Sequence, residues 1–290
     1  MSRITQKSAV APLNPWANLS TGVPNQAYSA NPASTPVTTA GVGFADSGFQ
    51  SYVGQKFDTS DGRELALVQN GAVALVAGVL VQSEAEVTAH QKLAMTVPTT
   101  YPATAGLYQI LVTNSSTVLN VNKFQGGYAI VASGTGIGQM FKIASHAPAA
   151  NGATFVVTLE DPIQTTLDAT SKISLLQNPY ANVIISPATT ATGGPVGATL
   201  YNIAASTAPS YNATTGALTA AGIAQYGLIV THGPTTCLID STVTAVGYPL
   251  GVSKTTAGTL GVATLTTVPQ VAVSAQTLTS ANNGLVYLQL

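Results

Sequence analysis

The sequence predicts an all-β protein, in which two β-sandwich or β-barrel modules follow an extended N-terminal arm. From about residue 48 onward, short runs of Val, Ile, Thr, Tyr and Leu are interrupted by Gly, Asn and Pro roughly every eight to twelve residues. Helical periodicity is scarce: only residues 83–97 have a helix-forming composition, and their apolar spacing is poor. The expected division is an arm over 1–47, a β module over 48–186 and a C-terminal β module over 187–290.

The arm is rich in Pro, Asn, Ser and Thr and shows no sustained periodicity. Such a segment buries too little apolar area to become ordered alone, so we expect either a disordered tail or a strap that becomes ordered against a neighbour. Leu13, Trp16 and Tyr28 are the candidate subunit contacts, because large apolar side chains on an arm can anchor it in a pocket. The alternative for Trp16, the only tryptophan, is that it folds back on its own module.

In the first module, residues 64–69 and 73–82 are expected to be two strands joined by a turn at Asn70-Gly71. A membrane-spanning helix does not fit, because polar residues and a glycine interrupt this apolar run and it falls short of about 20 residues. The other strands expected in this module are 108–113, 128–133, 139–145, 154–160, 172–177 and 182–186.

The composition changes around residues 186–200, where Gly193-Gly194-Pro195 indicates an inter-domain loop. The strands expected after it are 199–204, 226–232, 236–243, 248–253, 259–265, 270–278 and 284–290. No fixed repeat period is present, which argues against a solenoid or a propeller.

Charge is sparse: nine Lys and Arg and ten Asp and Glu make 7% of the chain, against about 25% in a typical soluble domain. A neutral surface of small polar groups offers little repulsion between copies, which favours a homo-oligomer such as a trimer. From residue 169 onward the formal charges are Lys172, Asp240 and Lys254. This half lacks the clustered cations that direct binding to nucleic acid requires.

Gly134, Gly136 and Gly138 lie between two apolar runs and invite comparison with a phosphate-binding loop. Their spacing lacks the end of the dinucleotide fingerprint, a strand rather than a helix is expected after them, and no Gly-Lys-Ser/Thr follows. The remaining interpretation is the connection of a β-hairpin, in which glycines supply positive φ angles.

The histidines, at positions 90, 146 and 232, are isolated from one another, so no metal site and no cofactor are expected. His232, Cys237, Asp240 and Ser241 suggest a nucleophile constellation, but no nucleophile elbow accompanies them. A hairpin of residues 226–232 and 235–240, turning at Gly233-Pro234 and using Cys237 as a small core residue, is the better interpretation.

The carboxylate pairs Glu84/Glu86 and Glu160/Asp161 are compatible with a glycosidase but are better explained as solvated loop charges. Residues 58–64 are acidic but lack the spacing of a calcium loop. With no nucleophile, acid–base pair, metal cage or phosphate loop, a non-enzymatic protein is predicted. A polysaccharide-degrading enzyme stays as a disfavoured alternative, which loss of cleavage on changing Glu84 or Glu160 would support.

Residues 245–290 run through a Gly-x-Pro-Leu-Gly-Val-Ser strand, a glycine turn, a Val-Ala-Thr strand, Val-Ala-Val-Ser-Ala-Gln and a terminal Asn-Gly-Leu-Val-Tyr-Leu-Gln-Leu strand. This order resembles the closing module of virion structural proteins of tailed bacteriophages, especially capsid decoration (cement) proteins. Residues 70–82 are similar to an early strand pair of that family. The resemblance implies many copies on the capsid exterior, made in the host cytoplasm, that stabilise the shell by binding the major capsid protein. The chain is much longer than the small decoration proteins.

The leading hypothesis is therefore a non-enzymatic bacteriophage virion protein that clamps neighbouring capsid subunits through its arm and edge strands. The alternative is a phage fibre or adhesin that binds a host receptor or glycan, with Tyr and Asn of loops such as 208–216 stacking on sugars.

Overall fold

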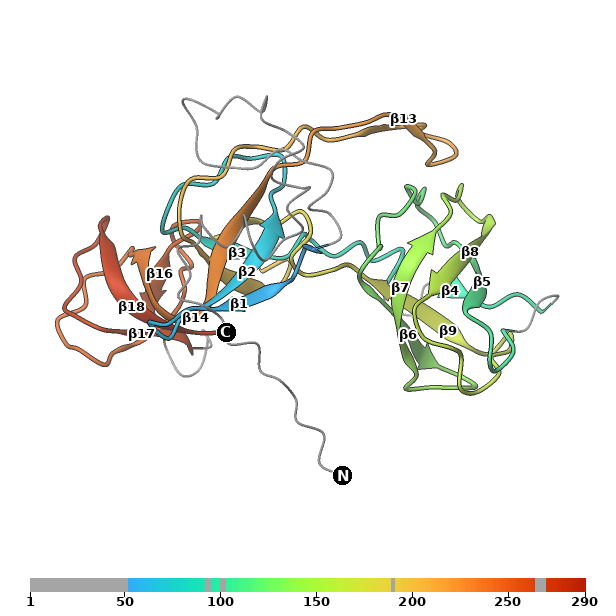
Figure 1. Ribbon diagram of the computed structural model, residues 1–290, viewed down its shortest axis with the longest axis horizontal. Helices are drawn as coiled ribbons and strands as arrows, with labels where there is room; N and C mark the ends of the chain where they lie inside the picture. Colours follow the sequence, from blue (N-terminus) through green and yellow to red (C-terminus); the bar gives the residue numbers. More distant parts are fainter. Residues whose placement is uncertain (1–51, 92–94, 100–102, 189–190, 264–269) are drawn as a thin grey trace. The chain divides into compact units, whose positions relative to one another are not determined.

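The structure is a computed structural model, and it describes residues 52–91, 95–99, 103–188, 191–263 and 270–290 (Figure 1). The predicted all-β class is confirmed, because every regular element longer than a single turn in these residues is a strand. The chain forms two compact units. The first, here called the sheet unit, combines the described residues among 52–82, 182–206 and 224–290; the second, the barrel unit, combines the described residues among 83–181 and 207–223.

The barrel unit contains a closed antiparallel barrel with the strand order β4-β5-β8-β7-β6-β9. The strands are β4 (Met95–Thr96), β5 (Gln109–Thr113), β6 (Tyr128–Ser133), β7 (Met140–His146), β8 (Thr154–Leu159) and β9 (Lys172–Leu176). The short β4 closes it, because Thr96 pairs with Thr113 of β5 on one side and with Lys172 of β9 on the other. Closure leaves no open sheet edge along these strands.

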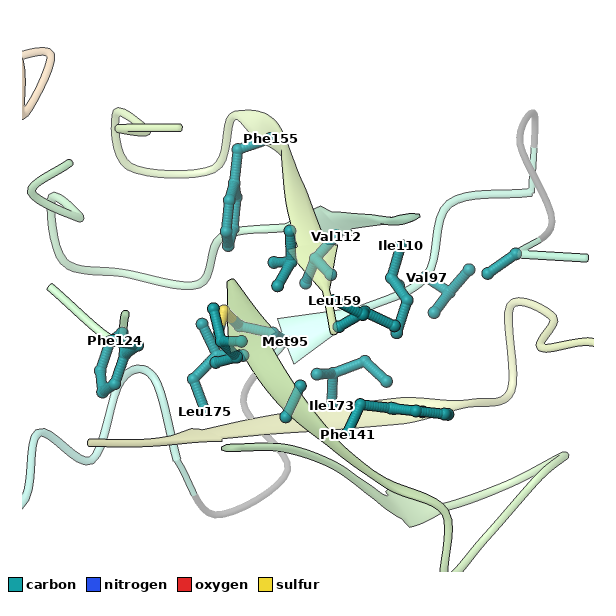
Figure 2. Close-up of a cluster of buried hydrophobic side chains, with 14 of the residues drawn as sticks. Met95, Val97, Ile110, Val112, Phe124, Phe141, Phe155, Leu159, Ile173 and Leu175 are labelled. Atoms are coloured by element: carbon teal, nitrogen blue, oxygen red, sulfur yellow. The ribbon is translucent and has the colours of Figure 1, made fainter. Parts of the chain in front are cut away.

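Alternation of side chains along each barrel strand fills the interior. Ile110 and Val112 of β5 point inward, and so do Phe155 and Val157 of the neighbouring β8. Figure 2 shows Ile110, Val112 and Phe155 gathered with Phe141 of β7 and with Ile173 and Leu175 of β9 in a single core. The barrel is therefore a packed hydrophobic core.

The sheet unit is built on one curled sheet of ten strands. Its main path runs β10-β3-β11-β14-β18-β17-β15-β16, while β2 pairs with β14 and β1 pairs with β2. The strands are β1 (Lys56–Asp58), β2 (Glu64–Gln69), β3 (Leu80–Gln82), β10 (Ile184–Ile185), β11 (Pro195–Thr199), β14 (Tyr226–Leu238), β15 (Pro249–Val252), β16 (Leu260–Val262), β17 (Gln270–Ser274) and β18 (Asn283–Gln289).

The 13-residue β14 joins two hydrophobic clusters of this unit. Its first half pairs with β2 and buries Tyr226, Leu228 and Val230 in one cluster. Its second half pairs with β18 and contributes Cys237 to the other, which contains Val286 and Leu288.

The predicted hairpin turn at Gly233-Pro234 is wrong, because β14 continues straight through it: Gly233 pairs with Leu288 and Pro234 with Tyr287. Proline is tolerated there because β2 pairing has ended at His232, so the side of β14 opposite β18 needs no ladder hydrogen bond from residue 234. Gly233 has φ of 97°, a backbone conformation that favours glycine.

The predicted hairpin of 64–69 and 73–82 is also wrong. Residues 64–69 do form β2, but β2 pairs with β1 and β14, whereas β3 begins only at Leu80 and pairs with β10 and β11. Asn70 is buried rather than exposed in a turn, and it bridges Val183 in parallel. Its side chain donates hydrogen bonds to backbone carbonyls, which replace the contacts of a tight turn.

Two further expectations differ from the structure. The described part of residues 83–97 contains no helix, and β4 begins at Met95. The expected loop 186–200 contains β11, whereas residues 200–204, expected in a strand, lie outside one. Pro195 can start β11 because it occupies the first position of the strand.

The two units interleave along the chain, unlike the consecutive modules 48–186 and 187–290 that the composition suggests. The barrel unit also takes the hairpin of β12 (Ser210–Tyr211) and β13 (Leu218–Ala220) from between β11 and β14. The Val121 N–H donates a 3.1 Å hydrogen bond to the Gly216 carbonyl at the tip of this hairpin. The interleaving follows from long-range pairing, since β2 pairs with β14, and β3 pairs with β10 and β11, all of which come after residue 182.

Candidate interaction surface

The glycine-rich loop 134–138 joins β6 to β7, which pair antiparallel, so the predicted hairpin connection is confirmed. Gly134, Gly136 and Gly138 all have positive φ angles, between 79° and 90°. A side chain at Gly134 would overlap the carbonyl group of Thr170, so this loop lies directly against the segment that precedes β9. The glycines serve backbone packing.

The residues that suggested a nucleophile constellation do not face one another. His232 is exposed on the outer face of β14, opposite Gln289, whereas Cys237 is buried on the core face, and burial raises the pKa of its thiol to about 12. The Asp240 carboxylate accepts hydrogen bonds from three hydroxyls, those of Ser241, Ser253 and Thr255. His232 and Cys237 therefore lie on opposite faces of β14, and the hydrogen bonds of Asp240 go to hydroxyl groups, which is not the geometry of an activated nucleophile.

The candidate carboxylates lie in ion pairs. Glu84 pairs with Lys123 at 2.8 Å, and Glu160 pairs with Lys142 at 3.3 Å. In the acidic loop, the hydrogen bond from Arg63 and then that from Thr59 lower the pKa of Asp61 to about 2. Within the part of the chain that the structure describes, no group of three or more His, Cys, Asp or Glu side chains gathers to hold a metal ion, and no helix is long and apolar enough to cross a membrane.

A row of apolar side chains crosses the outer face of the sheet unit. Tyr287 of β18 lies directly opposite Pro234 of β14 on one side and Val273 of β17 on the other, and Val273 lies opposite Pro249 of β15. Leu285, two residues before Tyr287, extends the row along the same face. We call these five residues the sheet patch.

The opposite face of the same strands is buried. Leu250, Ala272 and Leu288 form the matching row there, one residue along each strand from Pro249, Val273 and Tyr287. The two rows differ in exposure: Tyr287 is 50% exposed and Leu285 39%, whereas Leu288 is fully buried. These strands are therefore apolar on both faces, although one of the faces meets solvent.

The barrel unit carries a second exposed apolar surface. Tyr128 of β6 lies opposite Leu176 of β9, and Ile130 of β6 lies opposite Met140 of β7. Met140 is 60% exposed, Tyr128 and Leu176 are exposed, and Ile130 is partly buried. These four residues form the barrel patch, and Lys142, opposite Tyr128, marks its border.

The predicted contact residues Leu13, Trp16 and Tyr28 lie outside the described residues. Sequence reasoning missed both patches, whose residues it expected only as parts of separate strands or, for Pro234, in a turn. A signal was present in residues 284–290, where Leu, Val, Tyr and Leu follow one another without the alternation of a strand that has one polar face. Only the register shows that the outer residues of four strands align.

Comparison with models of protein families, with curated proteins and with solved structures found no match. The fold and the two patches define an all-β protein that consists of a packed barrel and a curled sheet, each with an exposed apolar surface.

Proposed function

We propose that this protein is a non-enzymatic virion structural protein, which binds the exterior of an assembled phage capsid and stabilises it by clamping neighbouring major capsid subunits. The observation that carries the proposal is the sheet patch. Side chains of this kind, tyrosine, proline and branched aliphatics with no charge among them, are typical of the buried centre of a protein–protein interface.

The clamp has several contacts. The sheet patch and the barrel patch belong to different units, so one chain carries two separate apolar surfaces. When one of them is bound, tethering raises the effective concentration of the other, and individually weak contacts together give stable attachment. The low charge of the surface favours packing of many copies on one shell.

The N-terminal arm, residues 1–47, supplies a third contact in this proposal. It binds a neighbouring subunit by strand addition, in which backbone hydrogen bonds provide affinity and side-chain pockets provide specificity. Leu13, Trp16 and Tyr28 are its anchors. This part of the proposal rests on composition, since the arm holds the only tryptophan and has no acidic residue before Asp46.

Cosedimentation with phage capsids that lack this protein tests the proposal. We expect saturable binding of the full chain and higher capsid resistance to heat. Replacing Tyr287 and Leu285 by Ser should weaken binding at least tenfold, since about 1.4 kcal/mol is enough for that loss. Leu218→Ser is the matched control, because Leu218 is 51% exposed on β13 and belongs to neither patch.

Two further variants test the other contacts separately. The double variant Tyr128→Ser/Met140→Ser tests the barrel patch, and a chain that starts at residue 48 tests the arm. Weakening by each of them supports a multivalent clamp. Absence of saturable capsid binding by the full chain, or equal binding by all variants, would contradict the capsid proposal.

A fibre or adhesin that binds a host receptor or glycan is the second candidate, and the exposed tyrosines favour it. Tyr108 and Tyr248 are 51% and 42% exposed, as sugar stacking requires. The loop 208–216 is less suited: Tyr211 is partly buried, and the Asn212 side-chain oxygen accepts the N–H groups of Thr214 and Thr215. Glycan binding that Tyr248→Ser abolishes, without capsid binding, would favour this candidate.

A further inference from the structure

Two buried histidines pack against one phenylalanine, Phe124, in the barrel unit. The ring of His90 meets that of Phe124 edge-on, with centroids 5.6 Å apart. The centroid of the His146 ring lies 6.0 Å from that of the same Phe124 ring. His146 in turn packs edge-on against Phe155 at 6.1 Å. Phe124 and Phe155 are core residues of the barrel (Figure 2), so both histidines border that core.

The hydrogen bonds of His146 require its neutral form. The backbone N–H of Phe124 points at Nε2 at 3.0 Å, so Nε2 must accept, and Nδ1 then carries the proton and donates to the Ala147 carbonyl at 3.0 Å. Every polar atom of the ring is satisfied in this tautomer. A second proton would place an N–H on Nε2 against the N–H of Phe124, and the hydrogen bond would be lost.

His90 is also suited only to the neutral form. Its Nε2 lies 3.3 Å from the Thr117 carbonyl and donates to it, while its Nδ1 is buried without a hydrogen-bond partner among the described residues. A proton on Nδ1 would create a buried cation with an unsatisfied donor, which is costly. The backbone carbonyl of His90 accepts a bond from Leu175 of β9, so a movement of this residue reaches the barrel wall.

The charged groups around the pair do not favour protonation. Burial lowers the pKa of His90, the Thr117 carbonyl opposes this, and the charge of Lys123 lowers it further. Burial likewise lowers the pKa of His146, against the Ala147 carbonyl, and a charge on His90 adds to the effect. Glu84 is paired with Lys123.

The strands packed around the pair bring no other charge close to it. Lys142 of β7 lies on the outer face opposite Tyr128, Lys172 lies at the opposite end of β9 from Leu175, and β8 contains no charged residue.

We propose that His90 and His146, both packed against Phe124, form an acid-sensitive lock: the barrel unit is stable while both rings are neutral and loosens when they take up protons. The sheet unit has no such lock, because its one described histidine, His232, is exposed. The proposal does not depend on the proposed function, since it concerns the stability of one unit in the isolated protein.

The direction of the effect follows from the lowered pKa values. An unfolded histidine titrates near pH 6.5, above the folded value, so the unfolded unit binds more protons between the two values. The contribution of the two neutral histidines to the stability of the barrel unit is complete above about pH 6.5, and it falls as the pH drops below that value. Each histidine raises the equilibrium constant for opening by up to about tenfold per pH unit in that window.

Hydrogen exchange of the full chain, followed by mass spectrometry between pH 7.5 and 5, measures this directly. After correction for intrinsic exchange rates, protection of β5 and β8 should fall by at least about tenfold, while protection of β14 should stay constant as the internal control. The double variant His90→Gln/His146→Gln should abolish the fall, because a glutamine amide can occupy the position of Nε2 but does not titrate. His232→Gln is the matched control and should behave as the wild type.

An equal loss of barrel protection in wild type and double variant, or no loss in the wild type, would overturn the proposal. Nitrogen NMR of the wild-type histidines gives a second test that does not depend on folding of a variant. We expect His146 as the Nδ1–H tautomer, with titration well below pH 6.5. Ordinary titration of both buried rings near pH 6.5 would show that the lock does not exist.

Discussion

Asn70 donates a 2.7 Å hydrogen bond from its side-chain amide to the carbonyl of Ala204, a residue 134 positions further along the chain. The same amide donates a 2.9 Å bond to the Val73 carbonyl. Ser206 donates from its hydroxyl to the Asn70 carbonyl and accepts from the backbone N–H of Gln225. Asn70 therefore connects the end of β2 to the segment that ends at Ser206 and, through Ser206, to Gln225. Residues 207–223, between these two segments, belong to the barrel unit.

Asn70→Ala should destabilise the sheet unit by about 1–3 kcal/mol, because it leaves the buried Ala204 carbonyl and the partly buried Val73 carbonyl without this donor. The free energy of unfolding from a denaturant titration measures the loss. Asn151→Ala is the control, since Asn151 is exposed in a turn, and it should change stability by less than about 0.5 kcal/mol. Equal effects of the two substitutions would mean that Asn70 does not hold these segments.

Gly216→Ala should release the β12–β13 hairpin from the barrel. A Cβ at residue 216 would overlap the Leu119 carbonyl oxygen, and the backbone has φ of 71°. Gly152→Ala is a matched control, because Gly152 has the same φ and open space around it.

The control should lose only about 1–2 kcal/mol for the left-handed conformation. Gly216→Ala should lose about 1–3 kcal/mol more through overpacking, together with the exchange protection of the Val121 amide. If both variants keep that protection, the close approach at residue 216 does not hold the hairpin.

Cys237 should be unreactive in the folded protein. Its side chain is fully buried, and burial raises the pKa of the thiol to about 12, so almost no thiolate is present near pH 8. A chromogenic disulfide reagent at pH 8 should modify it only after denaturant is added. Modification of the native protein at the rate of a free thiol would show that this part of the sheet opens readily.

The same thiol makes alkaline pH destabilising. An unfolded cysteine loses its proton near the ordinary pKa of 9.0, below the folded value, so its contribution to stability is complete below that pH and is lost as the pH rises towards about 12. Cys237→Ala should remove this component of the pH dependence, which denaturant titrations at pH 8 and pH 10 can compare. Cys237→Ser should cost about 1–3 kcal/mol, because a buried hydroxyl lacks a partner there.

Asp240→Asn should destabilise the sheet unit by about 1–2 kcal/mol, because an amide cannot accept the same set of hydroxyl hydrogen bonds. Burial raises the pKa of Asp240, but the bonds from Ser253, Thr255 and Ser241 together outweigh burial and hold it below 3.8. The ionised Asp240 carboxylate therefore stabilises the sheet unit above pH 3.8, and this stabilisation is lost as the pH falls below that value. Asp161→Asn, at an exposed position, is the control for denaturant titrations at pH 7 and pH 3.

Local patterns were sufficient to predict every barrel strand except the two-residue β4, which lies in the stretch of helix-forming composition. Residues 128–133 form β6 as expected, and the expected strand 172–177 forms β9 apart from its last residue. Residues 128–133 are rich in aromatic and β-branched residues and are bounded by glycines, a local signal of a strand that requires no knowledge of the pairing partner. The glycine hairpin after β6 was predictable for the same reason.

The sheet unit could be predicted less completely, because its strands are chosen by distant partners. The run at 73–82 has the composition of a strand, but only Leu80–Gln82 forms one. These residues pair with β10 and β11, which lie more than 100 residues later in the chain. Gly233-Pro234 has the composition of a turn, yet β18 pairs across it and keeps β14 straight. Local composition cannot indicate which backbone groups a distant strand will satisfy.

For the candidate surfaces, too, some properties could be predicted from the sequence and others depend on the tertiary structure. Sparse charge, the all-β class and the non-helical spacing of apolar residues are properties of the chain that can be read without any pairing. Pro234, Tyr287, Val273 and Pro249 form one outward-facing row only because of the register between four strands. In the same way, His90 and His146 meet at Phe124 only through the packing of the barrel unit. Both arise only when backbone hydrogen bonding and core burial bring distant segments together, because a shift of one residue would turn Tyr287 inward and Leu288 outward.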